Sequence, residues 1–111
     1  MKKLAIIGVG GHAKVLTDTA YKVGWEYIDY YDDNYNSLKI TSKFNLKGDV
    51  DRLIKNKLNY NGVAVAVGDN ETRWRIITKL NTNEIKLVTL VHPNSYVASN
   101  VALESGVVIF A

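Results

Sequence analysis

A glycine-rich segment near the amino terminus contains the residue types that most clearly suggest binding chemistry. It reads Gly-Val-Gly-Gly-His over residues 8–12 and follows the short apolar run at residues 4–7. Three glycines within four positions leave backbone N–H groups uncovered where a strand turns into a helix. Exposed N–H groups at the positive end of a helix dipole favour a phosphate. The segment predicts a nucleotide or nucleotide-sugar site, with ligand-binding candidates Gly8, Gly10, Gly11 and His12.

These residues also have purely structural explanations. The glycines can simply permit a tight turn between strand and helix, and His12 can hydrogen-bond to backbone at the start of the helix. Three glycines directly after a buried strand favour the approach of a phosphate over turn geometry alone. For His12 the residue type and position leave both roles open.

A pair of acids ends the second β-rich run of the chain. Asp32 and Asp33 stand 24 and 25 residues after Gly8. In dinucleotide-binding folds an acid near this position accepts hydrogen bonds from ribose hydroxyls. Turn chemistry is the structural alternative, and we expect only one of the two carboxylates to contact a ligand.

A third polar loop follows the apolar run at residues 62–67. Gly68, Asp69 and Asn70 can supply a side-chain oxygen that caps the next helix. The same loop is a candidate ligand site, because it follows a strand. Arg73 in the first helical turn is long enough to reach a phosphate, and a solvent-exposed arginine is the alternative.

The elements that must position these loops alternate along the chain. We expect strands at residues 4–7, 27–31, 62–67 and 87–91, with a short edge strand at 38–40, and helices at residues 13–23, 50–58 and 71–80. We expect Asp49 to cap the second helix and Trp74, Ile77 and Leu80 to face the core from the third. This order predicts an α/β fold, a small Rossmann-like three-layer domain with a parallel sheet. Right-handed crossovers then bring the three polar loops to one edge of the sheet.

Composition limits the function classes. The chain has 111 residues, 47% hydrophobic and 23% charged, which is typical of one soluble globular domain. The net charge of +3 comes from scattered Lys and Arg, so we expect no nucleic-acid partner. The absence of cysteine excludes thiolate metal sites and fits a reducing compartment, and we expect no metal. No apolar run approaches the roughly 18 residues of a membrane span, so we expect a cytoplasmic protein.

The last part of the chain follows a different pattern. An aliphatic residue recurs at every sixth position, at Val91, Val97, Leu103 and Ile109. A second six-residue series runs through Ser95, Val101 and Val107. This period predicts a hexapeptide-repeat β-helix, and an ordinary pair of alternating strands is the alternative. We therefore divide the chain into a Rossmann-like domain, 1–91, and an incomplete first coil, 92–111.

One coil cannot bury a core by itself, because each repeat needs a neighbour to cover it. The chain also closes on an apolar stretch at residues 108–111 that has no polar cap. We therefore expect this chain to be a shortened form of a longer protein.

Four motifs in order resemble one known family. They are Gly-x-Gly-Gly-His-Ala-Lys-Val from residue 8, a strand ending in Asp-Asp, Val-Gly-Asp-Asn-Glu-Thr-Arg from residue 67, and Leu-Val-His-Pro from residue 90. Together they resemble the PglD/NeuD-type sugar acyltransferases. These are bacterial acetyl-CoA-dependent enzymes that acetylate nucleotide-linked amino sugars or sialic acids.

The resemblance implies a two-domain enzyme of glycan biosynthesis. A Rossmann-like amino-terminal domain binds the nucleotide sugar, often a UDP-sugar, and a left-handed β-helix forms a homotrimer that binds acetyl-CoA between subunits. A histidine in a later coil acts as the general base, which suits an imidazole that titrates near neutrality. The chain has only His12 and His92, and neither stands at that place. We expect the acetyl-CoA site and the catalytic residues to lie outside this chain, which is then inactive alone and trimerises weakly.

Two other functions fit parts of the sequence. Residues 8–13 match the G-x-G-x-x-G/A fingerprint of NAD(P)-binding domains, but the chain is too short for the second mononucleotide half of that fold. A stand-alone regulatory module that binds a nucleotide and presents its tail to partners is the third possibility.

Overall fold

A four-stranded parallel sheet forms the centre of the fold. The computed structural model describes residues 2–34, 45–88, 90–91 and 108–109. The sheet has the order β3-β2-β1-β4, and all its pairings are parallel. Its strands are β1 (Lys3–Ile7), β2 (Tyr27–Tyr31), β3 (Leu46–Gly48) and β4 (Gly62–Val65). The buried, near-continuous apolar runs of β1 and β4 are typical of a parallel sheet covered on both faces.

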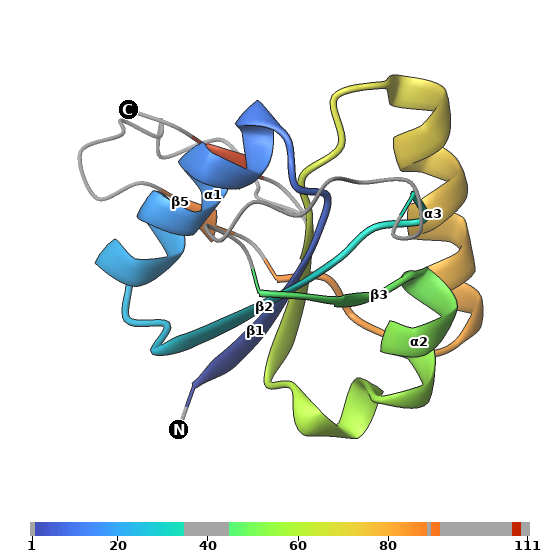
Figure 1. The fold of residues 1–111 in the computed structure, drawn as a ribbon, viewed down its shortest axis with the longest axis horizontal. Coiled ribbons are helices and arrows are strands. Elements are labelled where there is room, and N and C mark those ends of the chain that lie inside the picture. The colour runs from blue at the N-terminus through green and yellow to red at the C-terminus, as the bar shows by residue number, and fades with distance from the viewer. Residues whose placement is uncertain (1, 35–44, 89, 92–107, 110–111) are drawn as a thin grey trace, which may run out of the picture.

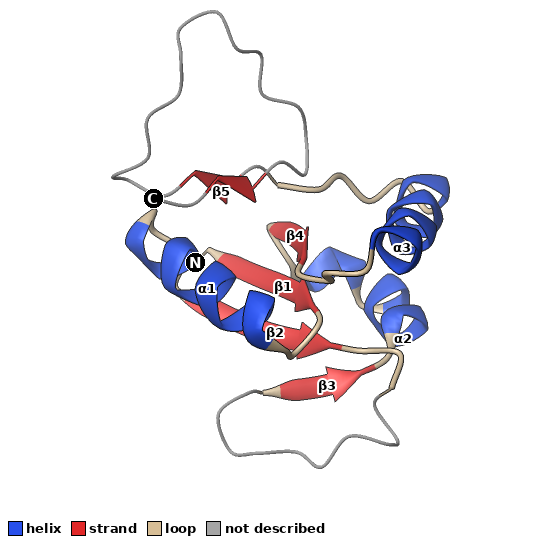
Figure 2. Ribbon diagram, turned by 90° about the horizontal axis from the view of Figure 1, so that it is seen from above, coloured by secondary structure: helices blue, strands red, loops and turns tan. Residues whose placement is uncertain are grey.

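Helices cover both faces of this sheet, as the sequence predicts. Helix α1 (Gly11–Lys22) lies on one face, and α2 (Val50–Lys55) and α3 (Asn70–Thr82) lie on the other (Figures 1 and 2). The strand–helix alternation therefore produces the expected three-layer α/β arrangement, and the fold class is confirmed.

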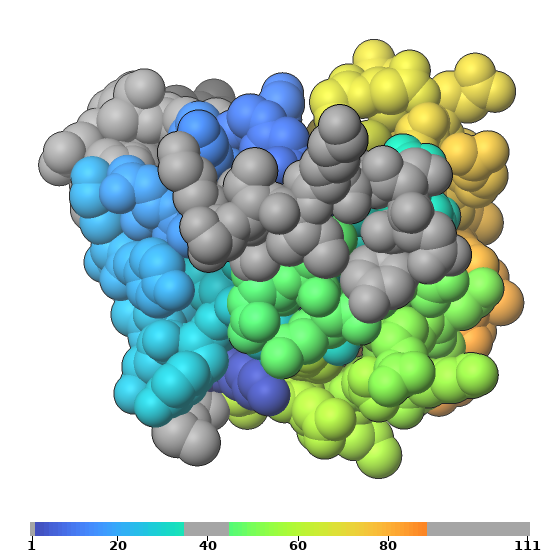
Figure 3. All heavy atoms as spheres, viewed as in Figure 1, coloured from blue at the N-terminus to red at the C-terminus, as the bar shows by residue number. Residues whose placement is uncertain are grey.

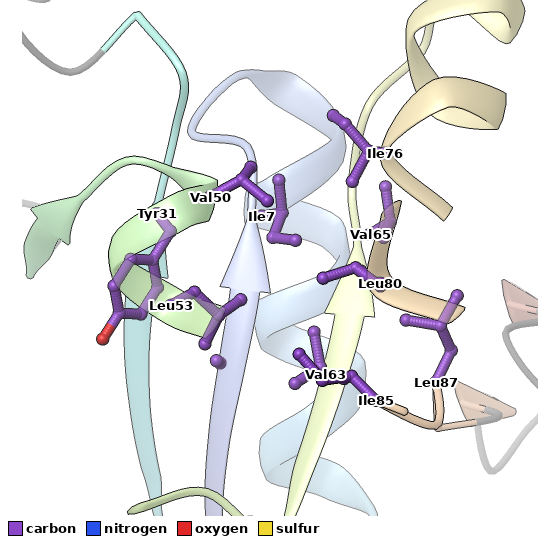
Figure 4. Close-up of a cluster of buried hydrophobic side chains, with 11 residues drawn as sticks. Ile7, Tyr31, Val50, Leu53, Val63, Val65, Ile76, Leu80, Ile85 and Leu87 are labelled. Carbon is purple, nitrogen blue, oxygen red and sulfur yellow. The ribbon is translucent and has the colours of Figure 1, made fainter. Parts of the chain in front are cut away.

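The hydrophobic core divides into two halves, because alternate residues of each strand point to opposite faces. On one face Leu4 and Ile6 of β1 pack with Leu16 and Ala20 of α1. On the other face side chains of β1, β2 and β4 pack against α2 and α3 (Figure 4). Its members include Ile7, Tyr31, Val50, Leu53, Val63, Val65, Ile76 and Leu80.

Strand β3 is absent from the sequence prediction. It has three residues, Leu-Lys-Gly, and its pairing with β2 shifts register between Tyr30 and Tyr31. Three residues carry too little alternation to mark a strand, so pairing with β2 alone defines it. The edge strand expected at 38–40 lies outside the described residues.

The prediction for the core face of α3 is partly wrong. Trp74 is 71% exposed, whereas Ile76 and Leu80 are buried and Ile77 is partly buried. A position six residues before Leu80 lies about 120° away from it around a helix. The sheet therefore packs against the side of α3 that carries Ile76 and Leu80, and the Trp74 side chain lies in solvent.

The second predicted helix is shorter than expected. Asp49 caps it as predicted, because its Oδ1 accepts the Arg52 N–H at 2.8 Å. The α-helix ends at Lys55, and a short 3-10 turn, η1 (Lys57–Asn59), completes the predicted range. Strand β4 likewise stops at Val65, two residues before the end of its apolar run.

The strand expected at 87–91 divides between two partners. Leu87 forms an isolated parallel bridge with Val63 of β4. Beyond it β5 (Leu90–Val91) pairs in parallel with β6 (Val108–Ile109) in a separate two-stranded sheet. The rest of the expected β-helix coil, 92–107 and 110–111, lies outside the described residues.

Helix length bears on membrane insertion. Within the part of the chain that the structure describes, no helix is both long and apolar enough to span a bilayer.

Candidate functional site

Gly8 joins the ends of three strands. Its N–H donates to the carbonyl of Tyr31 at the end of β2, at 2.8 Å. Its φ is +110°, and a Cβ built there would lie 2.5 Å from the carbonyl oxygen of Ala66, just after β4. Only glycine fits this conformation and this contact. The loops after β1 and β4 therefore meet, as the crossover argument predicts, and Gly8 has a structural role.

Gly10 and Gly11 differ from Gly8, because they border open space. A Cβ built on either residue meets no atom of the described residues within 4 Å. Gly10 is the N-cap residue of α1 and supplies no side-chain hydrogen bond, and the first turn of α1 contains no acid. Among the described residues, no acceptor takes the amides of Gly11 and His12. The positive end of α1 is therefore open to an anion.

The amino terminus of α3 is closed by its own cap. Asp69 Oδ2 accepts the Thr72 N–H at 2.9 Å and the Thr72 hydroxyl at 2.6 Å. These two bonds lower the pKa of the Asp69 carboxyl, so the cap is ionised at neutral pH. Asp69 therefore caps α3, as the sequence predicts.

The amino terminus of α2 is also occupied. Asp33 Oδ1 accepts the Val50 N–H at 3.1 Å, in addition to the bond from Arg52 to Asp49. Two carboxylates therefore accept the amides of Val50 and Arg52 in the first turn of α2. Of the three α-helices in the described residues, only α1 lacks a side-chain cap.

A cleft of about 190 Å³ adjoins the open end of α1. We call it the carboxyl-edge cleft. A Cβ built on Gly68 would lie 3.5 Å from Nε2 of His12, so the loops after β1 and β4 are in contact here. The lining residues are His12, Leu16, Val65, Ala66, Val67, Gly68, Asn70 and Arg73.

The structure brings together some of the predicted site residues and not others. His12, Gly68, Asn70 and Arg73 line the carboxyl-edge cleft. Asp32 and Asp33 do not line it, and each accepts a backbone N–H, Asp32 from Asn34 and Asp33 from Val50. The remaining site candidates of the sequence border the same turn or cap α3.

The two acids after β2 have different structural roles, since Asp32 closes a turn and Asp33 caps a helix further along the chain. Asp32 Oδ1 accepts the Asn34 N–H at 2.8 Å, and the Asp32 amide donates to the carbonyl of Gly48 at 2.9 Å. Asp33 caps α2. Contact of either carboxylate with a nucleoside stays a prediction.

Sequence reasoning missed the apolar wall of the carboxyl-edge cleft. Leu16, one helical turn after His12, and the residues that follow β4 form this wall. A recognisable signal was present, since Val65, Ala66 and Val67 directly precede a glycine at a strand end. The end of β4 at Val65 turns the last two of them into loop residues.

The chemistry of the carboxyl-edge cleft favours anion binding. Its lining contains a histidine and an arginine and no acidic side chain. Across the described residues, no group of three His, Cys, Asp or Glu could hold a metal ion. The arrangement offers backbone N–H groups, a helix dipole and donor side chains, which together suit a phosphate.

Comparison with known proteins identifies a matching family and a curated relative. Residues 3–80 match the family described as the PglD N-terminal domain. A curated relative, the UDP-N-acetylbacillosamine N-acetyltransferase of Bacillus subtilis (strain 168), is 27% identical over 117 aligned positions, covering 100% of this chain and 52% of the relative.

Two solved structures are similar over nearly the whole chain. The acetyltransferase domain of PglB from Neisseria gonorrhoeae FA1090, in complex with acetyl coenzyme A, has a TM-score of 0.85 and 31% identity, with coverage of 99% of this chain and 53% of that one. PerB from Caulobacter crescentus, in complex with CoA and GDP-perosamine, has a TM-score of 0.85 and 28% identity, covering 100% and 52%. The chain thus spans about half the length of the relatives that it matches.

Proposed function

The chain belongs to the PglD N-terminal domain family, and from that premise we propose that it binds the nucleotide part of a nucleotide-activated sugar. One observation carries the proposal. The amides of Gly11 and His12 at the start of α1 have no acceptor among the described residues, and they adjoin the carboxyl-edge cleft. A diphosphate supplies the acceptors and the negative charge that this end of the helix lacks.

The side chains around the open amides extend this binding mode. His12 and Arg73 donate to phosphate or sugar oxygens, and Asn70 offers both a donor and an acceptor for sugar hydroxyls. Asp32 accepts the Asn34 N–H with Oδ1, and its Oδ2, which has no hydrogen-bond donor among the described residues, is the proposed acceptor for a ribose hydroxyl. The carboxylate of Asp33 is the alternative acceptor, although it already caps α2.

We propose that this binding serves acetyl transfer to an amino sugar. The curated relative is named as a UDP-N-acetylbacillosamine N-acetyltransferase, and the PerB structure is a complex with CoA and GDP-perosamine. A UDP-amino sugar is the proposed substrate here. Acetyl-CoA and the general base belong, in this proposal, to a carboxyl-terminal part of a longer cytoplasmic protein.

The second domain in this proposal is a left-handed β-helix that forms a homotrimer. Support comes from the pairing of Leu90 with Val108 in parallel, eighteen residues further along the chain. A β-helix coil has three faces, and with six residues on each face the chain returns to the same position after eighteen residues. The pairing supports a domain boundary close to residue 91, because β5 pairs with β6 and not with the main sheet.

The test is a set of calorimetric titrations with UDP, GDP, UDP-N-acetylglucosamine and NADH. We expect a nucleoside diphosphate to bind and NADH to bind more weakly, since the carboxyl-edge cleft holds one mononucleotide site. Tighter binding of NADH would instead identify a nicotinamide-binding domain. Absence of binding by all four ligands would refute the proposed function.

A further inference from the structure

A second, larger cleft opens along the edge of the sheet formed by β2 and β3. Its volume is about 540 Å³, within the usual range of ligand sites, and it shares no lining residue with the carboxyl-edge cleft. We call it the edge cleft. In Figure 3 the start of β2 (cyan) lies beside residues of β3 and α2 (green) on the face in view.

The lengths of two elements create the edge cleft. Helix α2 has only six residues, so it covers only part of its face of the sheet. Strand β3 has three residues and pairs with Tyr30 and Tyr31 at the end of β2. Within the described residues, the first half of β2 therefore pairs with β1 on one side and with no strand on the other (Figure 1).

A buried carboxylate forms part of the wall of the edge cleft. Asp29 in the middle of β2 is only 7% exposed. Its Oδ2 accepts the Tyr60 hydroxyl at 2.8 Å and lies 3.5 Å from Lys3 Nζ, and its Oδ1 accepts the Asn45 side-chain amide at 3.0 Å. A buried charge is tolerated only with such partners. Asp29 therefore holds polar side chains in fixed positions along the cleft.

The tyrosines beside Asp29 form a chain of hydroxyl groups. The Tyr31 and Tyr60 hydroxyl oxygens are 2.6 Å apart, and the two rings pack edge to face. Burial and the bonds to Tyr31 and Asp29 raise the pKa of Tyr60, so its hydroxyl stays protonated. Hydroxyls and amides at set positions are the partners that the hydroxyl groups of a sugar require.

The edge cleft has more positive than negative side chains. Its cations are Lys3, Lys47 and Arg52, and its acids are Glu26 and Asp29. Lys3 is paired with Asp29, and Glu26 accepts the backbone amide of Lys2.

The two remaining cations are available to a ligand. Neither Lys47 nor Arg52 makes an ion pair within 4 Å in the described part of the chain. The stem of Arg52 packs over Gly48, where a built Cβ would lie 3.0 Å from Arg52 Cβ and Cγ. The lack of a side chain at Gly48 therefore leaves room for the stem of Arg52 beside the end of β3.

Two half-exposed aromatic rings complete the lining. Tyr21 is 53% exposed and Tyr27 is 51% exposed, and both border the edge cleft. Each ring offers a flat apolar face with a polar hydroxyl at its tip. A carbohydrate ring presents the matching combination of an apolar face and peripheral hydroxyls.

We propose that the edge cleft is a second binding site, distinct from the nucleotide site, for a sugar that carries a negative charge. Lys47 and Arg52 bind the carboxylate or phosphate of that sugar. The fixed polar groups around Asp29 bind its hydroxyls, and Tyr21 and Tyr27 contact its apolar face. The proposal is independent of the proposed function, because the two clefts share no residue.

The test is a titration of the ¹⁵N-labelled chain, followed by NMR, with glucuronate, glucose 6-phosphate, neutral glucose and inorganic phosphate. We expect one or both acidic sugars to shift the amides of Lys47 and Arg52, and to bind more tightly than glucose or phosphate. The tighter of the two identifies a carboxylate or a phosphate as the preferred anion. Lys47→Gln and Arg52→Gln should each weaken binding about tenfold, the loss of one charge-assisted contact.

Lys55→Gln is the matched control, because Lys55 is exposed on α2, lies outside the edge cleft and undergoes the same change of charge. The proposal is overturned if neither acidic sugar shifts these amides or if glucose binds as tightly. It is also overturned if inorganic phosphate alone binds as well, or if Lys55→Gln weakens binding as much as Arg52→Gln does. UDP added to the same samples should still shift Gly11 and His12, and failure of that shift would count against the proposed function alone.

Discussion

The glycine turn before α1 allows a sharp separation of structural from ligand-binding roles. The perturbation is a single methyl group, added at Gly8 or at Gly10. At Gly10 the backbone has φ −83° and ψ −159°, an extended conformation open to any residue, and a built Cβ meets no atom within 4 Å in the part of the chain that the structure describes. We expect Gly10→Ala to fold with a stability within about 0.5 kcal/mol of the parent chain.

The same methyl group at Gly10 should impair nucleotide binding. It would occupy the approach to the open amides of Gly11 and His12, so a phosphate loses one or more charge-assisted hydrogen bonds. Each is worth about 1.5–3 kcal/mol, which corresponds to a weakening of Kd by roughly 10- to 150-fold. Calorimetry with UDP measures this change, and circular dichroism with thermal melting checks the fold.

Gly8→Ala should show the opposite pattern in its stability. The new Cβ would lie 2.5 Å from the Ala66 carbonyl oxygen, and φ is +110°. Left-handed backbone strain costs about 1–2 kcal/mol and an overpacked contact about 1–3 kcal/mol, so we expect a loss of about 2–5 kcal/mol. For a chain of this size the melting temperature should fall by at least about 8 °C.

The reasoning would be refuted by either of two results. One is a Gly10→Ala chain that binds UDP as tightly as the parent chain, because the methyl group then does not obstruct the phosphate. The other is a Gly8→Ala chain with an unchanged melting temperature, because the close contact with Ala66 would then not constrain the turn.

Three further predictions concern packing and charge. Trp74→Ala should change the free energy of unfolding in urea by less than about 0.5 kcal/mol, whereas Leu80→Ala should lower it by about 2–5 kcal/mol, and equal effects would contradict the observed face of α3. Tyr60→Phe should lower the free energy of unfolding by about 1–3 kcal/mol, because buried Asp29 loses a hydrogen-bond donor, and an unchanged unfolding midpoint would contradict this. The folded state lowers the pKa of Asp69, so the stabilisation by its cap is complete above the ordinary aspartate pKa and is lost as pH falls through the lowered value. Melting temperatures measured between about pH 6 and pH 2 should fall as the cap is lost, and they should fall less steeply for Asp69→Asn. An equal fall in the parent chain and in this variant would show that the cap is not the source of the pH dependence.

The fold could be predicted well wherever one local pattern was strong. The apolar runs of β1 and β4 and the β-formers of β2 each mark a buried strand. Asp49 and Asp69 are helix caps because the amide three residues further along the chain lies within reach of a short side chain. These interactions span only a few residues, so the sequence contains all that is needed to find them.

The prediction was weaker wherever a contact joins distant segments. Strand β3 exists because Tyr30 pairs with Leu46, and no periodicity within three residues announces it. The exposure of Trp74 depends on which stripe of α3 the sheet covers. Asp33 resembled a ligand residue in the sequence, and only the position of α2 shows that it caps Val50.

The sequence by itself determined the order of strands and helices, the place of the glycine turn and the family resemblance. It did so because helix periodicity, turn chemistry and motif spacing are local properties of the chain. The tertiary structure alone decided that Gly8 is required by Ala66, whereas Gly10 and Gly11 border open space. It also decided that α1 is the α-helix without a side-chain cap among the described residues. The physical reason is that steric contacts and unsatisfied amides depend on what the fold places beside a residue, which spacing along the chain does not specify.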